Sequence, residues 1–318
     1  MLTISVVVET FIVTREYPGI PRAQSPLRAT LDRLTEQTYP KDQTEVIVVF
    51  DQTENVFYDL MDAQYPAMKF VLLKNADYFS MKNHGIHLAG GEIVALLDGD
   101  CIPTKDWLER IAATFSRGTD GVVGKTLYRP DHFLSRTFSV FDFGHVQADR
   151  NGEATGILAS NVAFKKGIAQ KHPFDGRGGR NGGCYFLACQ LKALGYKISY
   201  DPSQFVEHTY DIKGLGFIHK HLRRGIDSIN YFRLDDRKLM NETRWMKLGA
   251  VAPLIITVNR VLFDFGRILS YRRHLGIPVY TIPYFYLMSM VIRGIEFIGE
   301  MIALIKNPSD TVGIGAKV

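Results

Sequence analysis

Short apolar runs that end in acidic or polar residues recur through the first third of the chain. Residues 4–10 and 45–51 have the continuous apolar character of buried strands, and Leu27 to Thr38 has the pattern of a helix between them. A third apolar strand, within Ala89 to Asp100, ends in Asp98-Gly99-Asp100. Such alternation of strands and helices predicts an α/β fold, with a mostly parallel sheet covered by helices.

The Asp98-Gly99-Asp100 turn is the first candidate for chemistry. Bare carboxylates are not tolerated inside a buried strand, so both side chains should lie where the strand emerges, at the sheet edge where α/β proteins bind ligands. Two carboxylates on a tight turn offer hard oxygen ligands that suit Mg²⁺ or Mn²⁺ carried with a diphosphate. An isolated Asp-Gly-Asp is also compatible with a solvated turn, so the neighbouring segments decide.

The order of those segments resembles a known family. Glu9-Thr10 ends the first strand, Gln37-Thr-Tyr-Pro40 ends the helix, and Asp51 ends the second strand; Asn83 to Glu92 then leads into the Asp-Gly-Asp strand. Over roughly residues 3 to 225 this order resembles a family 2 glycosyltransferase with the GT-A fold. The resemblance implies transfer of a sugar, with inversion, from a nucleotide-diphosphate sugar to a saccharide or lipid-linked acceptor, with Mg²⁺ or Mn²⁺.

The resemblance also implies roles for individual residues. Lys82 matches the basic residue before the Asn, although a solvated helix lysine is the alternative, and His208 ends a strand where many such enzymes place a metal-contacting histidine, the alternative being a histidine bonded to backbone. Glu9-Thr10-Phe11 departs from the usual Pro-Thr-Tyr-Asn, which leaves base binding open. The implied donor-binding residues are Glu9, Thr10, Asp51, Lys82, Asn83, Asp98 and Asp100, and the implied metal ligands are Asp98, Asp100 and His208.

The acceptor half of the site departs further from the family. Asn161, in a segment similar to the family's Gly-Ala-Asn-x-Ala-Phe-Arg-Arg, is expected on the acceptor side, together with Arg180 in a glycine-rich loop. The family's Glu-Asp, whose aspartate is the general base, aligns with Gly183 and Cys184, which carry no carboxylate. Either Asp175 or another carboxylate such as Glu207 serves as base, or the acceptor is acidic enough to need little help, or the protein is inactive.

The composition changes in the last quarter of the chain, so we expect a glycosyltransferase domain at 1–225 and a helical region at 226–318. Residues 248–259 and 276–292 are uncharged and mostly apolar. Their lengths suit helices that lie on or span a membrane, at its cytoplasmic face, while a buried helical pair in a soluble dimer is the alternative. A basic patch suited to anionic lipid lies between the two runs: Arg267, Arg272, Arg273 and His274.

Composition and charge argue against several other classes of protein. The 318-residue chain has three cysteines without paired spacing, which argues against a disulfide framework or a zinc site, and Met1-Leu2-Thr3 runs into the first strand without a signal peptide. The net charge of +5 suits a membrane surface, but its dispersed basic residues and lack of a recognition motif argue against nucleic acid as a partner. A noncatalytic sugar-nucleotide or glycan-binding relative is the second hypothesis, and a nucleotidyltransferase the third.

Overall fold

The computed structural model describes residues 1–11, 13, 25–129, 133–209, 215–273 and 275–306, which fall into two compact units. The first unit comprises residues 1–139, 146–176 and 191–210, and the second comprises 140–145, 177–190 and 211–318. Helix α9 (Leu215–Leu234) belongs whole to the second unit. The domain boundary expected after residue 225 stays a prediction, and His274 lies outside the described residues.

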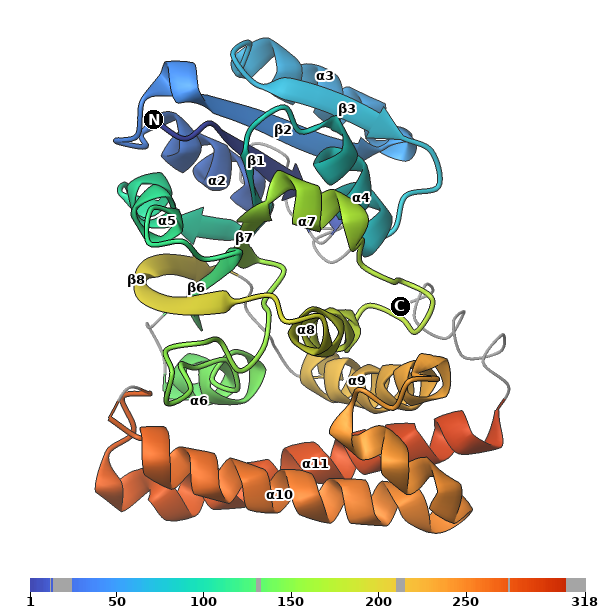
Figure 1. The fold of residues 1–318 in the computed structure, drawn as a ribbon. Coiled ribbons are helices and arrows are strands. Elements are labelled where there is room, and N and C mark those ends of the chain that lie inside the picture. The colour runs from blue at the N-terminus through green and yellow to red at the C-terminus, as the bar shows by residue number, and fades with distance from the viewer. Residues whose placement is uncertain (12, 14–24, 130–132, 210–214, 274, 307–318) are drawn as a thin grey trace. The chain divides into compact units, whose positions relative to one another are not determined.

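The first unit is built on a sheet of eight strands in the order β3-β2-β1-β4-β7-β6-β8-β5 (Figure 1). Four of its pairings are parallel, including those that join β3, β2, β1 and β4, and three are antiparallel. The strands are β1 (Ile4–Glu9), β2 (Thr44–Asp51), β3 (Lys69–Leu73), β4 (Ile93–Asp98), β5 (Cys101–Pro103), β6 (Gly121–Tyr128), β7 (Asn161–Lys165) and β8 (Ile198–His208). The predicted α/β class with a mostly parallel sheet is confirmed.

Helices follow the strands of the first unit along the chain. All six residues of β1 and all six of β4 are buried, which explains why these strands read as continuous apolar runs without alternation. The helices are α2 (Pro26–Thr35), α3 (Asn55–Gln64), α4 (Tyr78–Leu88), α5 (Trp107–Phe115), α6 (Phe133–Asp142), α7 (Lys166–Lys171) and α8 (Gly183–Ala193), with 3₁₀ turns at Lys41–Gln43 and Gln52–Glu54. Helix α6 begins in the first unit and ends in the second, whereas α8 begins in the second unit and ends in the first.

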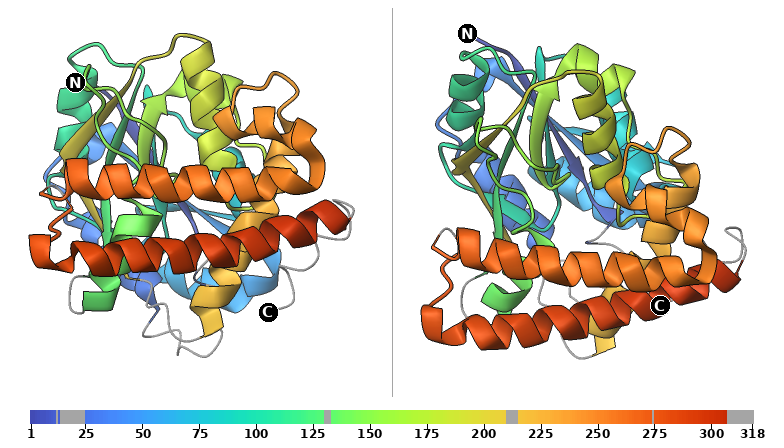
Figure 2. Two further views of the ribbon diagram at one scale, coloured as in Figure 1. Left: turned by 90° about the horizontal axis from the view of Figure 1, so that it is seen from below. Right: turned by 60° about the horizontal axis from the view of Figure 1, so that its bottom comes forward.

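The second unit is helical apart from its connections. Its elements are α9 (Leu215–Leu234), the 3₁₀ segment η4 (Asn241–Val251), α10 (Ala252–Tyr271), the short turn η5 (Val279–Thr281) and α11 (Ile282–Ile305). Helices α10 and α11 run side by side in opposite directions, joined by the turn at 272–281, and form a long hairpin (Figure 2). Among the described residues, Asn241–Tyr271 is long and apolar enough to cross a membrane, judged by length and composition only.

Two glycines bring α9 and α11 into backbone contact. A Cβ atom on Gly299 would overlap the carbonyl oxygen of Leu222, and a Cβ atom on Gly225 would overlap the carbonyl oxygen of Glu296. Glycine is therefore required at both positions, because any side chain would force the helix axes apart. The α10–α11 hairpin therefore packs against α9 through α11.

Gly299→Ala should destabilise the second unit, whereas Gly294→Ala on the same helix should not. The first substitution forces two backbones apart and should lower the free energy of unfolding by about 1–3 kcal/mol, as for overpacking of a core. A Cβ atom on Gly294 meets nothing within 4 Å, so its replacement should raise stability by about 0.5–1 kcal/mol through helix propensity. Urea titrations followed by circular dichroism measure both effects; equal stabilities would contradict the close crossing.

Candidate functional site

Acidic residues meet at the carboxyl edge of the parallel strands. In the register of β1 with β4, Glu9 lies beside Asp98, and both are the last residues of their strands. Asp51 ends the neighbouring strand β2. Because parallel strands finish at one edge, residues separated by more than forty positions in sequence are brought together there.

Gly99 makes the turn between the two aspartates possible. Its backbone N–H donates to the Glu9 carbonyl oxygen at 2.9 Å, and a Cβ atom at this position would lie 2.8 Å from that oxygen. The Asp100 carbonyl oxygen in turn accepts hydrogen bonds from the backbone N–H and the hydroxyl of Thr209, at 2.9 and 2.8 Å. The turn is thus tied both to β1 and to the residue that follows β8.

The pairing of β5 with β8 adds a histidine to the two aspartates. Cys101 is opposite His208 in the antiparallel register, and His208 Nδ1 lies 3.5 Å from Asp100 Oδ2. One ligand atom from each of Asp98, Asp100, Cys101 and His208 falls within 4.8 Å of all the others, and all four residues are buried. The structure therefore brings together the three residues expected to ligate metal.

The chemistry of this donor set fits Mg²⁺ or, with the imidazole, Mn²⁺. Carboxylate oxygens suit both ions, and a neutral imidazole is a good ligand for the softer one. Burial, reinforced by the charge of Asp100, raises the pKa of the Cys101 thiol well above its ordinary value. Because the thiolate rather than the thiol binds metals, Cys101 is a poor candidate. Ligation by the two carboxylates and His208 stays a prediction.

Asp98 is held in place by a buried lysine and a tyrosine. Lys82 Nζ donates to Asp98 Oδ1 at 2.6 Å and to the Ala159 carbonyl oxygen at 3.0 Å, and the Lys82 side chain is fully buried. The Tyr78 hydroxyl donates to the same carboxylate at 3.0 Å. Lys82 is thus not the solvated helix lysine that the sequence left open. Its direct contact with donor stays a prediction, since in this structure it acts through Asp98.

The surroundings of the Glu9 carboxyl disfavour its ionised form. Burial above all, and then the nearby Asp98 carboxylate, raises the pKa of the Glu9 carboxyl well above its usual range. A protonated Glu9 can donate a hydrogen bond, which an ionised one cannot. Beside it, the Thr10 hydroxyl donates to the Val49 carbonyl oxygen at 3.0 Å, so both residues lie at the strand end where the resemblance expects the nucleotide.

Asp51 shapes the segment after β2. Its Oδ1 accepts hydrogen bonds from the backbone N–H and hydroxyl of Thr53, at 2.9 and 2.7 Å, and its Oδ2 accepts one from the Ala76 N–H at 3.1 Å. These bonds join the ends of two loops on one carboxylate. Its role toward ribose or base stays a prediction.

The asparagines expected at the site make intramolecular contacts. Asn161 is fully buried and uses all four hydrogen-bonding positions of its amide: Oδ1 accepts from Trp107 and Gln204, and Nδ2 donates to the carbonyl oxygens of Lys125 and Gln204. These bonds connect β6, β7 and β8. Asn83 bonds both backbone groups of Phe174 at 2.8 and 2.9 Å. Their contacts with substrate stay predictions.

The second unit contains the glycine-rich loop and a carboxyl that the sequence did not single out. The Oδ2 atom of Asp227, on α9, accepts hydrogen bonds from the backbone and side-chain nitrogens of Asn181, at 2.8 and 2.9 Å. The Tyr231 hydroxyl donates to the Gly179 carbonyl oxygen at 2.7 Å. The loop that carries Arg180 is therefore fastened to α9. Burial raises the pKa of Asp227 to about 6, against the opposing effect of these bonds.

Sequence reasoning missed Tyr78 and Asp227 for different reasons. Tyr78 follows Asp77, whose carboxylate caps α4 in a capping box with Ser80, and this Asp-x-x-Ser pattern could have located the helix start and hence the tyrosine four residues before Lys82. Asp227 lies within a basic helical segment, where a single acid has no distinguishing pattern. Gly183, which aligns with the first residue of the family's Glu-Asp pair, begins α8.

Lys82→Met should destabilise the first unit far more than Tyr78→Phe does. Removing the lysine leaves a buried carboxylate without its cation, which costs about 3–5 kcal/mol, whereas losing the tyrosine hydroxyl removes one hydrogen bond to a charged group, about 1.5–3 kcal/mol. Chemical denaturation of both variants measures the difference. If Lys82→Met were as stable as the native protein, the pair would not be what holds Asp98.

Comparisons with known proteins agree with this geometry. Residues 21–172 match the family model described as Glycosyl transferase family 2. Glycosyltransferase AglE of Haloferax volcanii is 33% identical over 149 residues, which cover 45% of this chain and 45% of the relative. Glucosyl-dolichyl phosphate glucuronosyltransferase of the same organism is 25% identical over 203 residues, covering 56% of this chain and 63% of the relative.

The matched regions span about half to two thirds of these relatives' lengths. Among solved structures, mannosyltransferase PcManGT from Pyrobaculum calidifontis, in complex with GDP-Man and Mn²⁺, superposes with a TM-score of 0.60 at 17% identity, covering 95% of this chain and 87% of that one. At this identity the likeness concerns the fold. Family match, fold and edge of acidic residues agree: the chain has the GT-A fold, and its residues 21–172 are similar to family 2 glycosyltransferases.

Proposed function

We propose that this protein transfers a sugar from a nucleotide-diphosphate sugar to a saccharide or lipid-linked acceptor, with Mg²⁺ or Mn²⁺ as cofactor. The observation that carries the proposal is the convergence of Asp98, Asp100 and His208 within 4.8 Å at the sheet edge. The sugar-nucleotide donor is supported by a structural neighbour that contains GDP-Man and Mn²⁺. The donor's own base and sugar are left open.

The cation would be held by Asp98, Asp100 and His208, and its charge would offset the negative charge that builds on the departing nucleoside diphosphate. Lys82 and Tyr78 contribute by orienting the Asp98 carboxylate before substrate arrives, which avoids reorganisation during the reaction. Glu9, Thr10 and Asp51 would position the nucleoside, because they lie at or just after the ends of β1 and β2, at the sheet edge where β4 ends in Asp98. Asn83 would contact the donor, and Arg180 the acceptor.

For the acceptor we propose a glycan or glycolipid at the cytoplasmic face of a membrane. One relative is named as acting on glucosyl-dolichyl phosphate, a lipid-linked sugar, and the apolar stretch Asn241–Tyr271 is suited to contact a membrane. Inversion is the stereochemistry expected from the family. It requires a base to remove the proton from the acceptor hydroxyl as the new bond forms.

Two carboxyl groups are candidates for that base. Asp175 follows Phe174, whose ring stacks on Phe79 with centroids 5.1 Å apart, so its backbone is well anchored within the first unit. Asp227 meets the glycine-rich loop near the positions where the family carries its own carboxylate, and its raised pKa of about 6 suits a base that works near neutral pH.

The second hypothesis is a noncatalytic sugar-nucleotide-binding relative that assists a partner enzyme. The observation that favours it is the absence of a carboxylate at Gly183 and Cys184. Purified protein screened against several nucleotide sugars with Mn²⁺ separates the two hypotheses. Nucleoside diphosphate release supports the transferase, while a thermal shift without release, even when acceptors are supplied, supports the binding protein.

Asp100→Ala should abolish the metal-dependent part of nucleoside diphosphate binding while the fold is retained. Asp51→Ala should weaken binding whether or not metal is present, because the proposal assigns its carboxylate to the nucleoside and not to the cation. Calorimetry with a nucleoside diphosphate, in Mn²⁺ and in chelator, measures both. Unchanged affinity of Asp100→Ala in Mn²⁺ would remove Asp100 from the metal site, and equal losses in chelator would mean that the two roles are misassigned.

Replacing the true base should lower turnover by a factor of about 10² or more with little change in donor affinity. Asp175→Asn and Asp227→Asn are the matched variants. If Asp227 is the base, turnover of the native protein should fall as the pH drops below about 6, because the carboxyl is then protonated and cannot accept a proton. Turnover near the native level in one variant excludes that residue, and in both it excludes the pair.

A further inference from the structure

The outer face of the α10–α11 hairpin is apolar along its length. Nine large apolar side chains on the two helices are each 44–61% exposed. In contrast, every charged side chain of α10 and α11 is buried or only partly exposed. We call this surface the outer face; its residues are Leu254, Val258, Leu262, Phe263, Leu269, Leu287, Met290, Val291 and Ile298.

The charged residues of the same helices are turned inward and paired. Arg293 bonds Asp264 at 2.9 Å and Glu296 at 2.6 Å, and Arg260 bonds Glu300 at 2.9 Å. The side chains of the three acids are about 1% exposed. Arg267, which the sequence placed in a lipid-binding basic patch, is also buried and bonds Asp264 at 2.9 Å, so that assignment is wrong.

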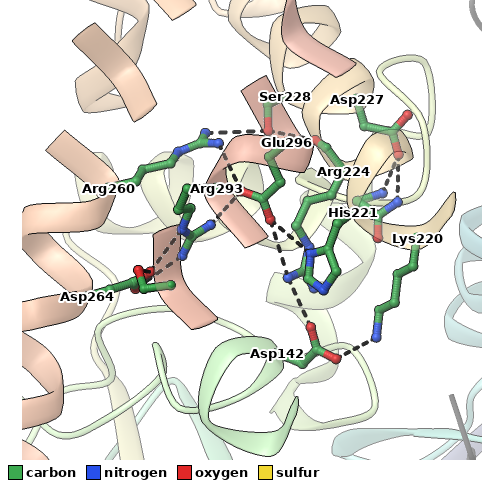
Figure 3. A network of polar contacts seen from close by, with 12 residues as sticks. Asp142, Lys220, His221, Arg224, Asp227, Ser228, Arg260, Asp264, Arg293 and Glu296 are labelled. Carbon is green, nitrogen blue, oxygen red and sulfur yellow. Dashed lines mark hydrogen bonds and ion pairs between the residues drawn. The ribbon is translucent and has the colours of Figure 1, made fainter. Parts of the chain in front are cut away.

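This ionic network, which we call the inner network, continues into α9 and the end of α6 (Figure 3). Glu296 accepts from His221 Nδ1 at 3.1 Å, while Arg224 and Lys220 reach Asp142 at 3.0 and 2.6 Å. The nearby cations hold the pKa values of Asp142 and Glu296 well below their usual range, against the effect of burial. The hairpin is thus fixed to α9 by its polar side.

The hairpin has its apolar side chains on the outside and its charges on the inside. This distribution is the reverse of the one expected for a helix pair exposed to water. Soluble monomers rarely expose a contiguous apolar surface of this extent, and one that persists marks contact with a membrane or another protein. In the most apolar part of Asn241–Tyr271, only 22% of the stretch is buried inside the protein. The outer face is therefore unlike a helix of a soluble core.

The charges at the two ends of the hairpin identify its partner. Residues 241–306 contain eight Lys or Arg and four Asp or Glu; three of the four acids are buried and paired, and Glu242, whose side chain is 21% exposed, faces Arg260. Among the described residues no salt bridge involves Arg244, Lys247, Arg272, Arg273 or Lys306. A surface that is apolar in the middle and cationic at both ends complements hydrocarbon bordered by anionic headgroups.

The inner network also argues against a hairpin that crosses the bilayer. If α10 and α11 spanned it, Arg293, Glu296 and Glu300 would lie in the membrane, and their partners on α9 would have to follow or be lost. Charged side chains at the bilayer centre are energetically costly and are rare in membrane-spanning helices. With the hairpin flat in the interface, the whole network stays on the water side.

We propose that the α10–α11 hairpin lies in the plane of one membrane leaflet, with the outer face in the hydrocarbon boundary and its terminal cations among anionic headgroups. The inference deepens the membrane partner named under Proposed function, on which it rests, and it is independent of the donor site.

Flotation with vesicles of phosphatidylcholine and phosphatidylglycerol in equal parts tests the contact. The double variant Leu262→Glu/Phe263→Glu should reduce the fraction bound by roughly 100-fold, because two apolar side chains leave hydrocarbon and two charges replace them. The matched control Leu60→Glu/Leu194→Glu makes the same change at two exposed leucines in the first unit, 42% and 53% exposed, and should bind like the native protein. Circular dichroism confirms that each variant folds.

Cysteine labelling distinguishes a flat hairpin from a spanning one. Lys247→Cys and Arg273→Cys lie near opposite ends of α10, so a membrane-impermeant maleimide added outside the vesicles should label both, above the background of the native cysteines. Labelling of one of them only after detergent is added would overturn the flat orientation. Native protein that ignores the vesicles and forms a stable dimer without detergent would overturn the lipid contact and assign the outer face to a second copy.

Calorimetric titration of the same preparations with a nucleoside diphosphate and Mn²⁺ separates this inference from the proposed transferase activity. Vesicle binding without nucleotide binding supports the flat hairpin and overturns the donor site. Nucleotide binding without vesicle binding overturns the hairpin proposal alone.

Discussion

The concentration of carboxylates at one sheet edge is the constraint on which the first unit depends. Parallel strands β1, β2 and β4 end together, so Glu9, Asp51 and Asp98 are brought close by the backbone alone. Such crowding is unfavourable unless the charges are neutralised, and the structure does this in two ways. Lys82 supplies a buried cation to Asp98, and Glu9 has its pKa raised so that it can remain protonated. A bound divalent cation would complete the neutralisation.

Neutralisation of that kind links stability to function. A site already balanced by protein groups would have little use for a metal, and a site without Lys82 would leave Asp98 buried without a counter-charge. The site found here is only partly neutralised. Lys82 and Tyr78 both donate to Asp98, whereas Asp100, after the Gly99 turn, has His208 beside it.

The second unit solves a different electrostatic problem. The acids of the inner network are taken out of water, but each described one has cations beside it: Asp142, Asp264, Glu296 and Glu300. Buried pairs add little net stability compared with apolar packing, yet they fix which faces of the helices meet. Here they fix the hairpin so that its apolar residues point outward. Specific orientation, more than added stability, is what these pairs provide.

Much of this protein could be predicted from its sequence because the relevant signals are local. Continuous apolar runs located β1, β2 and β4, the acids at their ends located the sheet edge, and the apolar runs after residue 248 located the hairpin. Only the tertiary structure decided what each polar side chain contacts. Lys82 turned toward Asp98, Asn161 toward β6 and β8, and Arg267 toward the Val140 carbonyl oxygen. The physical reason is that periodicity along a chain reports which side of an element is apolar, whereas the partner of a buried charge is set by elements far away in sequence.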